Sequence, residues 1–129
     1  MPVIQRFEEL VAWQRARELT REVYLVTAEG KFARDYGLAG QIQRASVSIM
    51  ANIAEGFERG NRAEFHQFLS VAKASCAEVR SHIYVAVDVH YISPDEGARL
   101  QSIAEEVTRI VAGLRKAVEK QRDEQRGKK

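Results

Sequence analysis

The sequence predicts an all-α protein, an antiparallel up-down-up-down bundle of four helices. Three observations support this fold class: apolar residues recur at three- and four-residue steps in four long segments, no β-type alternation competes, and only two prolines and eight glycines interrupt 129 residues. Four amphipathic helices of similar length, joined by mostly short links, bury their apolar stripes by packing against one another. We expect one domain over residues 1–129, with a frayed basic tail from about residue 120.

The first helix is expected over residues 8–28. Its apolar stripe consists of Trp13, Ala16, Leu19, Val23 and Val26. Gly30 is placed to stop this helix, because glycine readily adopts the left-handed backbone conformation that follows a helix. Residues 31–36 are then predicted to form the one extended connection of the chain.

The second helix, from about residue 37 to no further than Gly60, organises the rest. One apolar face contains Leu38, Ile42, Ala45, Ile49 and Ile53. A second face, about a third of a turn away, contains Val47, Met50, Ala54 and Phe57. A helix with two apolar faces needs two sets of neighbours. We therefore predict that the second face, together with Tyr84 and Val85 of the next helix, contacts another copy of the chain.

The remaining side of this helix is a polar seam, whose main residues are Ser48, Asn52, Glu55 and Arg59. Two interpretations stay open. The seam is either a solvated edge, or it fixes the register of a neighbouring subunit or lines an opening in a ring, much as a buried polar residue fixes register in coiled coils.

The third helix is expected over residues 62–89, with Asn61 as its N-cap and Glu64 completing a capping-box-like start. Its apolar stripe contains Phe65, Phe68, Leu69, Ala72, Cys76, Val79, Ile83 and Val87. After a short connection, Ser93, Pro94 and Glu96 form a strong start for the fourth helix. This helix continues through Leu100, Val107 and Val118 and then dissolves into the basic tail.

The formal charge of +2 is unevenly distributed. From residue 115 onward there are seven basic and three acidic residues, so this end carries a net charge of +4 and the rest of the chain −2. A solvated helix end explains such a cluster. The alternative is RNA or DNA binding through phosphate contacts from Arg115, Lys116, Lys120 and Arg122.

Residues that could carry catalysis are sparse. None of the three histidines has a glutamate three residues before it, which excludes a di-iron helical motif, and Glu78 with His82 supplies too few ligands for a metal. Cys76 sits in an apolar stripe, where a thiol behaves as a small hydrophobe. We therefore expect no enzyme, cofactor, metal or small-molecule substrate, although an active site assembled between subunits remains a third alternative.

Neither a membrane-spanning run nor a signal peptide is recognisable, and the single cysteine suits a reducing compartment, so we expect a cytoplasmic protein.

The segment SVSIMANIAEGFERGNRAEFHQFLSVAKASCAEV, with FEELVAWQRARELTREVY and DYGLAGQIQRA before it, resembles the 23S rRNA intervening-sequence protein family. The motifs ANIAEG, YGL and Trp13 with Gln14 are specific in combination. The resemblance covers about residues 7–114 and implies cytoplasmic bacterial four-helix bundles that assemble as homopentamers, with no established biochemical role and no catalytic residues. The chain departs from the family at Met50, where proline is usual, and at Cys76, where leucine is frequent.

The family's fold is also similar to that of a pentameric accessory protein of diversity-generating retroelements, whose basic surface engages nucleic acid and a reverse transcriptase. Two main hypotheses follow. The first is a non-enzymatic homo-oligomer, a ring of five, that acts as a binding scaffold. The second is an RNA- or DNA-binding accessory protein that uses the basic residues near the C-terminal end.

Overall fold

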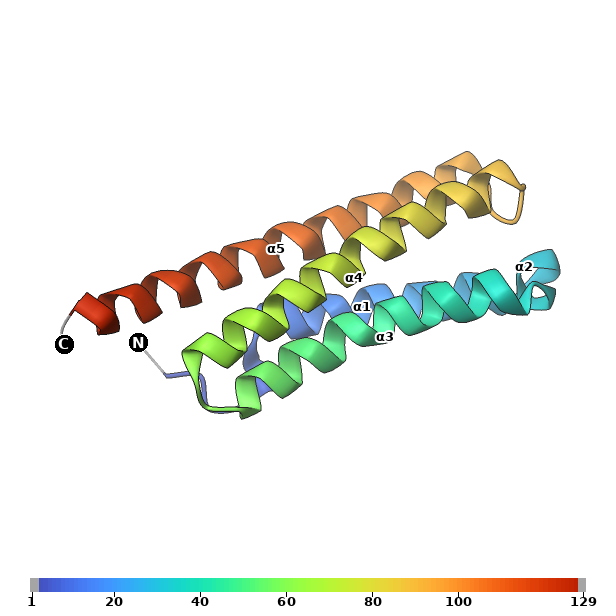
Figure 1. Ribbon diagram of the computed structural model, residues 1–129. Helices are drawn as coiled ribbons and strands as arrows, with labels where there is room; N and C mark the ends of the chain where they lie inside the picture. The colour runs from blue at the N-terminus through green and yellow to red at the C-terminus, as the bar shows by residue number, and fades with distance from the viewer. Residues whose placement is uncertain (1–2, 128–129) are drawn as a thin grey trace.

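The computed structural model describes residues 3–127 and confirms the all-α fold class. Four long helices and two short helical elements follow one another along the chain: η1 (Phe7–Glu9), α1 (Val11–Thr27), α2 (Gly30–Arg34), α3 (Tyr36–Glu58), α4 (Arg62–Asp88) and α5 (Pro94–Gly127). The residues that it describes contain no strand. Figure 1 shows the long helices as a bundle in which α4 and α5 form one layer and α1 and α3 the other.

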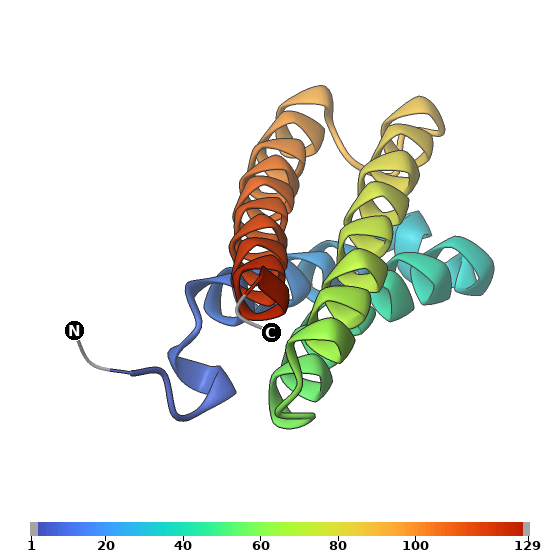
Figure 2. The ribbon, with the colours of Figure 1, turned by 60° about the vertical axis from the view of Figure 1, so that its left-hand side comes forward.

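Each long helix packs against two others, because α1 and α4 both contact α3 and α5. The predicted apolar stripes meet in one continuous core. Its largest fully buried side chains include Leu19, Ile42, Ile49, Ile53, Leu69, Val79, Ile83, Leu100, Val107 and Val111. Figure 2 views α5 obliquely from its C-terminal end and shows how α3 and α1 cross beneath the α4–α5 layer.

The first long helix begins three residues later than predicted. Phe7–Glu9 forms a turn of 3₁₀ helix, and the extended backbone of Leu10 separates this turn from α1. The Phe7 ring lies edge-on to Trp13, with ring centroids 5.3 Å apart. This edge-to-face contact folds the turn back onto α1, and aromatic pairs favour such geometry.

The prediction of an extended connection over residues 31–36 was wrong, because α2 occupies most of it. Phe32 is fully buried in the core, with its ring centroid 5.3 Å from that of Tyr91. A helix of five residues is too short to show a periodic apolar pattern. Gly30 does adopt the left-handed conformation, with φ of 59°, and turns the chain from α1 into α2.

The predicted turns at the ends of α4 are confirmed. Gly60 has φ of 68°, and the Asn61 side chain accepts a hydrogen bond from the Glu64 amide at 3.0 Å. At the start of α5, the Ser93 hydroxyl accepts from the Glu96 amide and the Glu96 carboxylate accepts from the Ser93 amide, each at 3.1 Å. This reciprocal pair is a complete capping box.

The last helix is longer than predicted, because α5 continues past residue 120 as far as Gly127. Residues 121–126 are mostly glutamine, arginine and glutamate, which are good helix formers and continue a helix even where no apolar stripe remains to be buried. Of the seven basic residues counted in the tail, Arg126, Lys128 and Lys129 lie outside the described side chains. Over the described part of the chain, no helix is long and apolar enough to cross a membrane.

Candidate functional site

The second apolar face of α3 is largely covered by the chain itself. Met50 and Phe57 are half-buried and pack against the core. The same side of α3 contacts α1, because the Thr20 hydroxyl donates to the Ser46 carbonyl at 3.2 Å. Of the four residues on this face, Val47 is left open, with 42% of its surface exposed, whereas Ala54 is half-buried. The second set of neighbours that α3 needs is thus partly α1 and η1.

Exposed apolar side chains lie on the outward sides of α3 and α4, as they also do on α1. Two residues that the sequence placed at the predicted interface are exposed, Val85 by 43% and Tyr84 by 62%. Val71, which is 50% exposed, was not among the interface residues predicted from the sequence. It lies three residues after Phe68 and four before Ser75, on the edge of α4 that faces α3. A valine outside the core stripe was the available signal.

Two residues of the polar seam have partners within the chain. The hydroxyls of Ser48 and Ser75 are 3.0 Å apart and share a hydrogen bond between α3 and α4. The side-chain amide of Asn52 donates to the Ser48 backbone carbonyl at 2.8 Å and to the Ser48 hydroxyl at 3.0 Å. This ladder joins α3 to α4, a role that neither interpretation of the seam included.

The other two seam residues lie at the solvent. The Arg59 guanidinium is 3.3 Å from the Glu55 carboxylate, with both side chains about half exposed. The same guanidinium lies 5.2 Å from the centroid of the Phe68 ring on α4. An exposed ion pair of this kind contributes little to stability.

The four candidate nucleic-acid contacts lie on two different sides of α5. Arg115 is half-buried on the α4 side, where its Nε donates to the Ser70 hydroxyl at 2.7 Å. Arg122 is also half-buried, with its Nε 3.9 Å from the Asp123 carboxylate. Lys116 and Lys120 are exposed.

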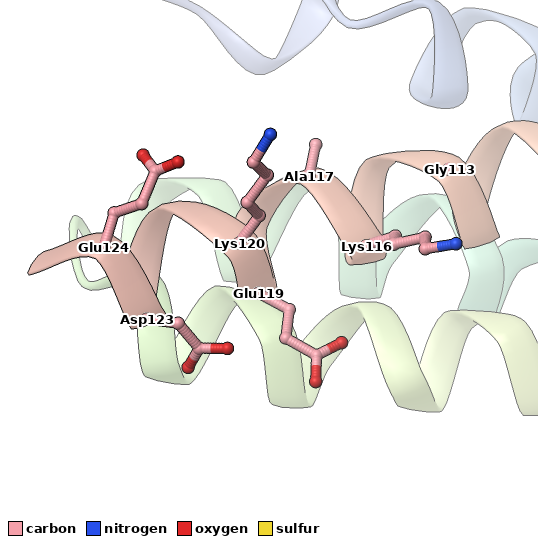
Figure 3. Close-up of a pocket in the computed structure, with 7 residues that line it drawn as sticks. All are labelled: Gly113, Lys116, Ala117, Glu119, Lys120, Asp123 and Glu124. Atoms are coloured by element: carbon pink, nitrogen blue, oxygen red, sulfur yellow. The ribbon is translucent and has the colours of Figure 1, made fainter. Parts of the chain in front are cut away.

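The two lysines border an open flank of α5, shown in Figure 3. Seven residues line this flank: Gly113, Lys116, Ala117, Glu119, Lys120, Asp123 and Glu124. All belong to one helix, so no second element encloses the depression. Three carboxylates stand among the two ammonium groups, and Figure 3 shows Lys120 and Glu124 pointing to the same side. The flank is therefore a mixed-charge surface rather than a preformed anion site.

Catalytic or metal chemistry finds little support. Burial of Cys76 raises the pKa of its thiol to about 11, which keeps it protonated and unreactive. His82 lies 3.8 Å from Glu78, as their spacing predicts. Within the described residues, however, no three metal-binding side chains come together.

Comparison with known proteins identifies a family that this chain matches. The model of a family described as 23S rRNA-intervening sequence protein matches residues 8–113. The chain belongs to this family. The match ends before Arg115, so all four candidate nucleic-acid contacts lie beyond the part of α5 that the family model covers. A search among curated proteins found no match.

A solved structure of similar fold is a protein of unknown function from the S23 ribosomal protein family of Bacteroides thetaiotaomicron. It is 22% identical in sequence, with a TM-score of 0.75, over 82% of this chain and 99% of the other. The likeness shows that the family's helical fold is shared. The identification as an intervening-sequence protein, made from ANIAEG, YGL and Trp13 with Gln14, is confirmed.

Proposed function

We propose that this intervening-sequence protein is a non-catalytic binding scaffold that works as a homo-oligomer, a ring of five antiparallel up-down-up-down bundles. The observation that carries the proposal is the set of valines left open on α3 and α4: Val47, Val71 and Val85, each 42–50% exposed. The number five rests on the family resemblance. The non-catalytic role is supported by the protonated, buried Cys76.

Burying these valines against a neighbouring subunit would stabilise the oligomer. Full burial of a valine side chain contributes roughly 1.5–3 kcal/mol relative to full exposure. With close to half of each side chain still open, a neighbouring subunit would gain about 1 kcal/mol per valine at each contact. A closed ring repeats that contact at every interface and presents each outward surface in several copies, which increases avidity for any partner that spans them.

The proposal is tested by light scattering on Val47→Lys and Val85→Lys. A charged ammonium at a buried interface is costly, so both variants are expected to shift the mass toward that of one chain. Leu25→Lys is the matched control, because Leu25 is 53% exposed on α1. If both α3 and α4 variants keep the wild-type oligomer, the outward faces of these helices are not the interface.

A second candidate is an RNA- or DNA-binding accessory protein, resembling those of retroelements. It is favoured by the exposed ammonium groups of Lys116 and Lys120, with Arg115 and Arg122 on the α4 side of the same helix. A gel shift at low salt is expected to retain a structured RNA, and replacing all four residues by glutamine is expected to abolish retention. Unchanged retention by the fourfold variant would remove this candidate.

A further inference from the structure

The groove between α4 and α5 is held together by hydrogen bonds along its length. At one end the Arg62 Nε donates to the Gln121 side chain at 3.2 Å. In the middle Arg115 donates to Ser70, and further along the Gln101 amide donates to the carbonyl of Arg80 at 2.9 Å. The side chains next to these contacts therefore lie along one seam between the two helices, which we call the α4–α5 groove.

Basic side chains recur in this groove at intervals of seven residues. Lys73 and Arg80 are seven residues apart on α4, and Arg115 and Arg122 are seven apart on α5. Seven residues are two helical turns, or roughly 10 Å along the axis. Lys73 and Arg115 lie near each other, since both line one hollow with Ser70, Ala74 and Ala77. The two helices thus contribute to one line of positive charge.

The central cations of this line are not neutralised. Among the residues that the structure describes, Lys73, Arg80 and Arg115 take part in no ion pair. The buried Nε of Arg80 has no hydrogen-bond partner there either. On the same flank, the carboxylate of Glu119 lies 3.7 Å from His66. The middle of the groove therefore holds three cations that have no carboxylate within 4.0 Å among the described residues.

An exposed aromatic ring continues the line. Lys73, Ala77, Arg80 and Tyr84 follow one another at steps of four, three and four residues, which places them on one flank of α4. Tyr84 is 62% exposed. A row of cations that ends at an open aromatic ring suits single-stranded nucleic acid, whose phosphates pair with the cations and whose bases stack on the ring.

We propose that the α4–α5 groove binds a single-stranded segment of nucleic acid, with phosphates on Lys73, Arg115 and Arg80 and one base stacked on Tyr84. The cations lie in a line, which favours an extended polyanion as the ligand, because a small anion would need only one of these positions. The inference rests on the second candidate function. It moves the main contact from the exposed α5 lysines to the groove and adds residues of α4 that sequence analysis did not select for this role.

The test is fluorescence anisotropy with a labelled oligouridine of about 20 nucleotides and an RNA duplex of about the same length, in roughly 50 mM salt. Lys73→Gln with Arg80→Gln is expected to weaken oligouridine binding by about tenfold or more. The slope of log K against log salt should fall by about 1.4, since each phosphate contact on a single strand contributes roughly 0.7. Lys73→Arg with Arg80→Lys keeps both charges and should bind within about twofold of wild type.

The matched control is Arg21→Gln with Lys31→Gln, which removes two exposed charges outside the groove. It is expected to change binding by less than about twofold. If Lys73→Gln with Arg80→Gln binds like this control while Lys116→Gln with Lys120→Gln abolishes binding, the groove is refuted and the second candidate function survives. If the wild-type protein binds neither probe, both fail.

Tyr84→Ala separates base stacking from phosphate binding. It is expected to weaken oligouridine binding roughly fivefold or more and to leave duplex binding unchanged, because paired bases cannot stack on the ring. An equal loss for both probes, or no loss for either, would overturn the stacking contact.

Discussion

The close packing of α3 against α4 at Gly56 gives the sharpest prediction about this fold. Gly56 is buried in α3 where it faces α4, and a Cβ added there would lie 2.6 Å from the Cβ of Phe68 and 3.0 Å from the Phe65 ring. The Phe68 Cβ is bonded to the backbone of α4 and cannot rotate away. Gly56→Ala therefore requires α3 and α4 to separate.

The magnitude follows from two opposing terms. Alanine improves helix propensity by about 1 kcal/mol over glycine, whereas overpacking a close contact costs about 1–3 kcal/mol. Because the clashing atom is fixed, we expect the upper part of that range and a net loss of about 1–2 kcal/mol. Gly113→Ala is the matched control, since a Cβ there meets nothing within 4 Å on the same kind of helix. It should gain about 0.5–1 kcal/mol.

Urea denaturation followed by far-ultraviolet circular dichroism measures both variants. All samples need the same protomer concentration, because assembly contributes to the measured stability. The two variants should differ by about 2 kcal/mol, with Gly56→Ala the less stable. If Gly56→Ala matched or exceeded Gly113→Ala in stability, the close packing of α3 on α4 would be wrong.

Three further outcomes are expected. Ser75→Ala should lower the free energy of unfolding by about 1 kcal/mol. The double variant Ser48→Ala with Ser75→Ala should lose less stability than the two single variants added together, and an additive loss would contradict the shared hydrogen bond. The Cys76 thiol should react with a thiol reagent at pH 8 only as fast as the protein opens, and rapid labelling of the native protein would contradict its burial. Hydrogen bonds from the Leu38 backbone amide and the Tyr91 hydroxyl hold the pKa of Asp35 below its ordinary value. The contribution of Asp35 to stability is therefore present above about pH 4 and is lost as the pH falls through that lowered pKa. Urea denaturation at a series of acid pH values should show that the free energy of unfolding of Asp35→Asn falls less steeply with pH than that of the wild type, and equal steepness would contradict the shift.

The sequence predicted the long helices well, because their apolar residues recur over many turns and their ends carry specific capping side chains. Asn61 and Ser93 act as predicted because each needs only partners within its own turn. The short helix α2 could not be predicted, because what stabilises it is the distant contact of Phe32 with Tyr91. Local pattern does not report contacts across so many residues.

The candidate interaction surfaces were harder to predict from the sequence. The two apolar faces of α3 predicted two sets of neighbours, but pattern alone did not distinguish a second helix of the same chain from a helix of another copy. The polar residues Ser48 and Asn52 likewise suggested an outer edge, whereas Ser48 shares a hydrogen bond with Ser75 of α4 and Asn52 donates to Ser48. The basic line of the α4–α5 groove was hidden, because Lys73 and Arg115 are far apart in the sequence and lie near each other only in the folded bundle.

The most direct test of the central claim is the mass of the wild-type protein in solution. Five chains of 14.6 kDa give about 73 kDa, and sedimentation equilibrium at micromolar concentration should report that mass. A single species of 14.6 kDa under the same conditions would show that Val47, Val71 and Val85 remain open to water. The scaffold proposed for this family member would then have no assembly to support it.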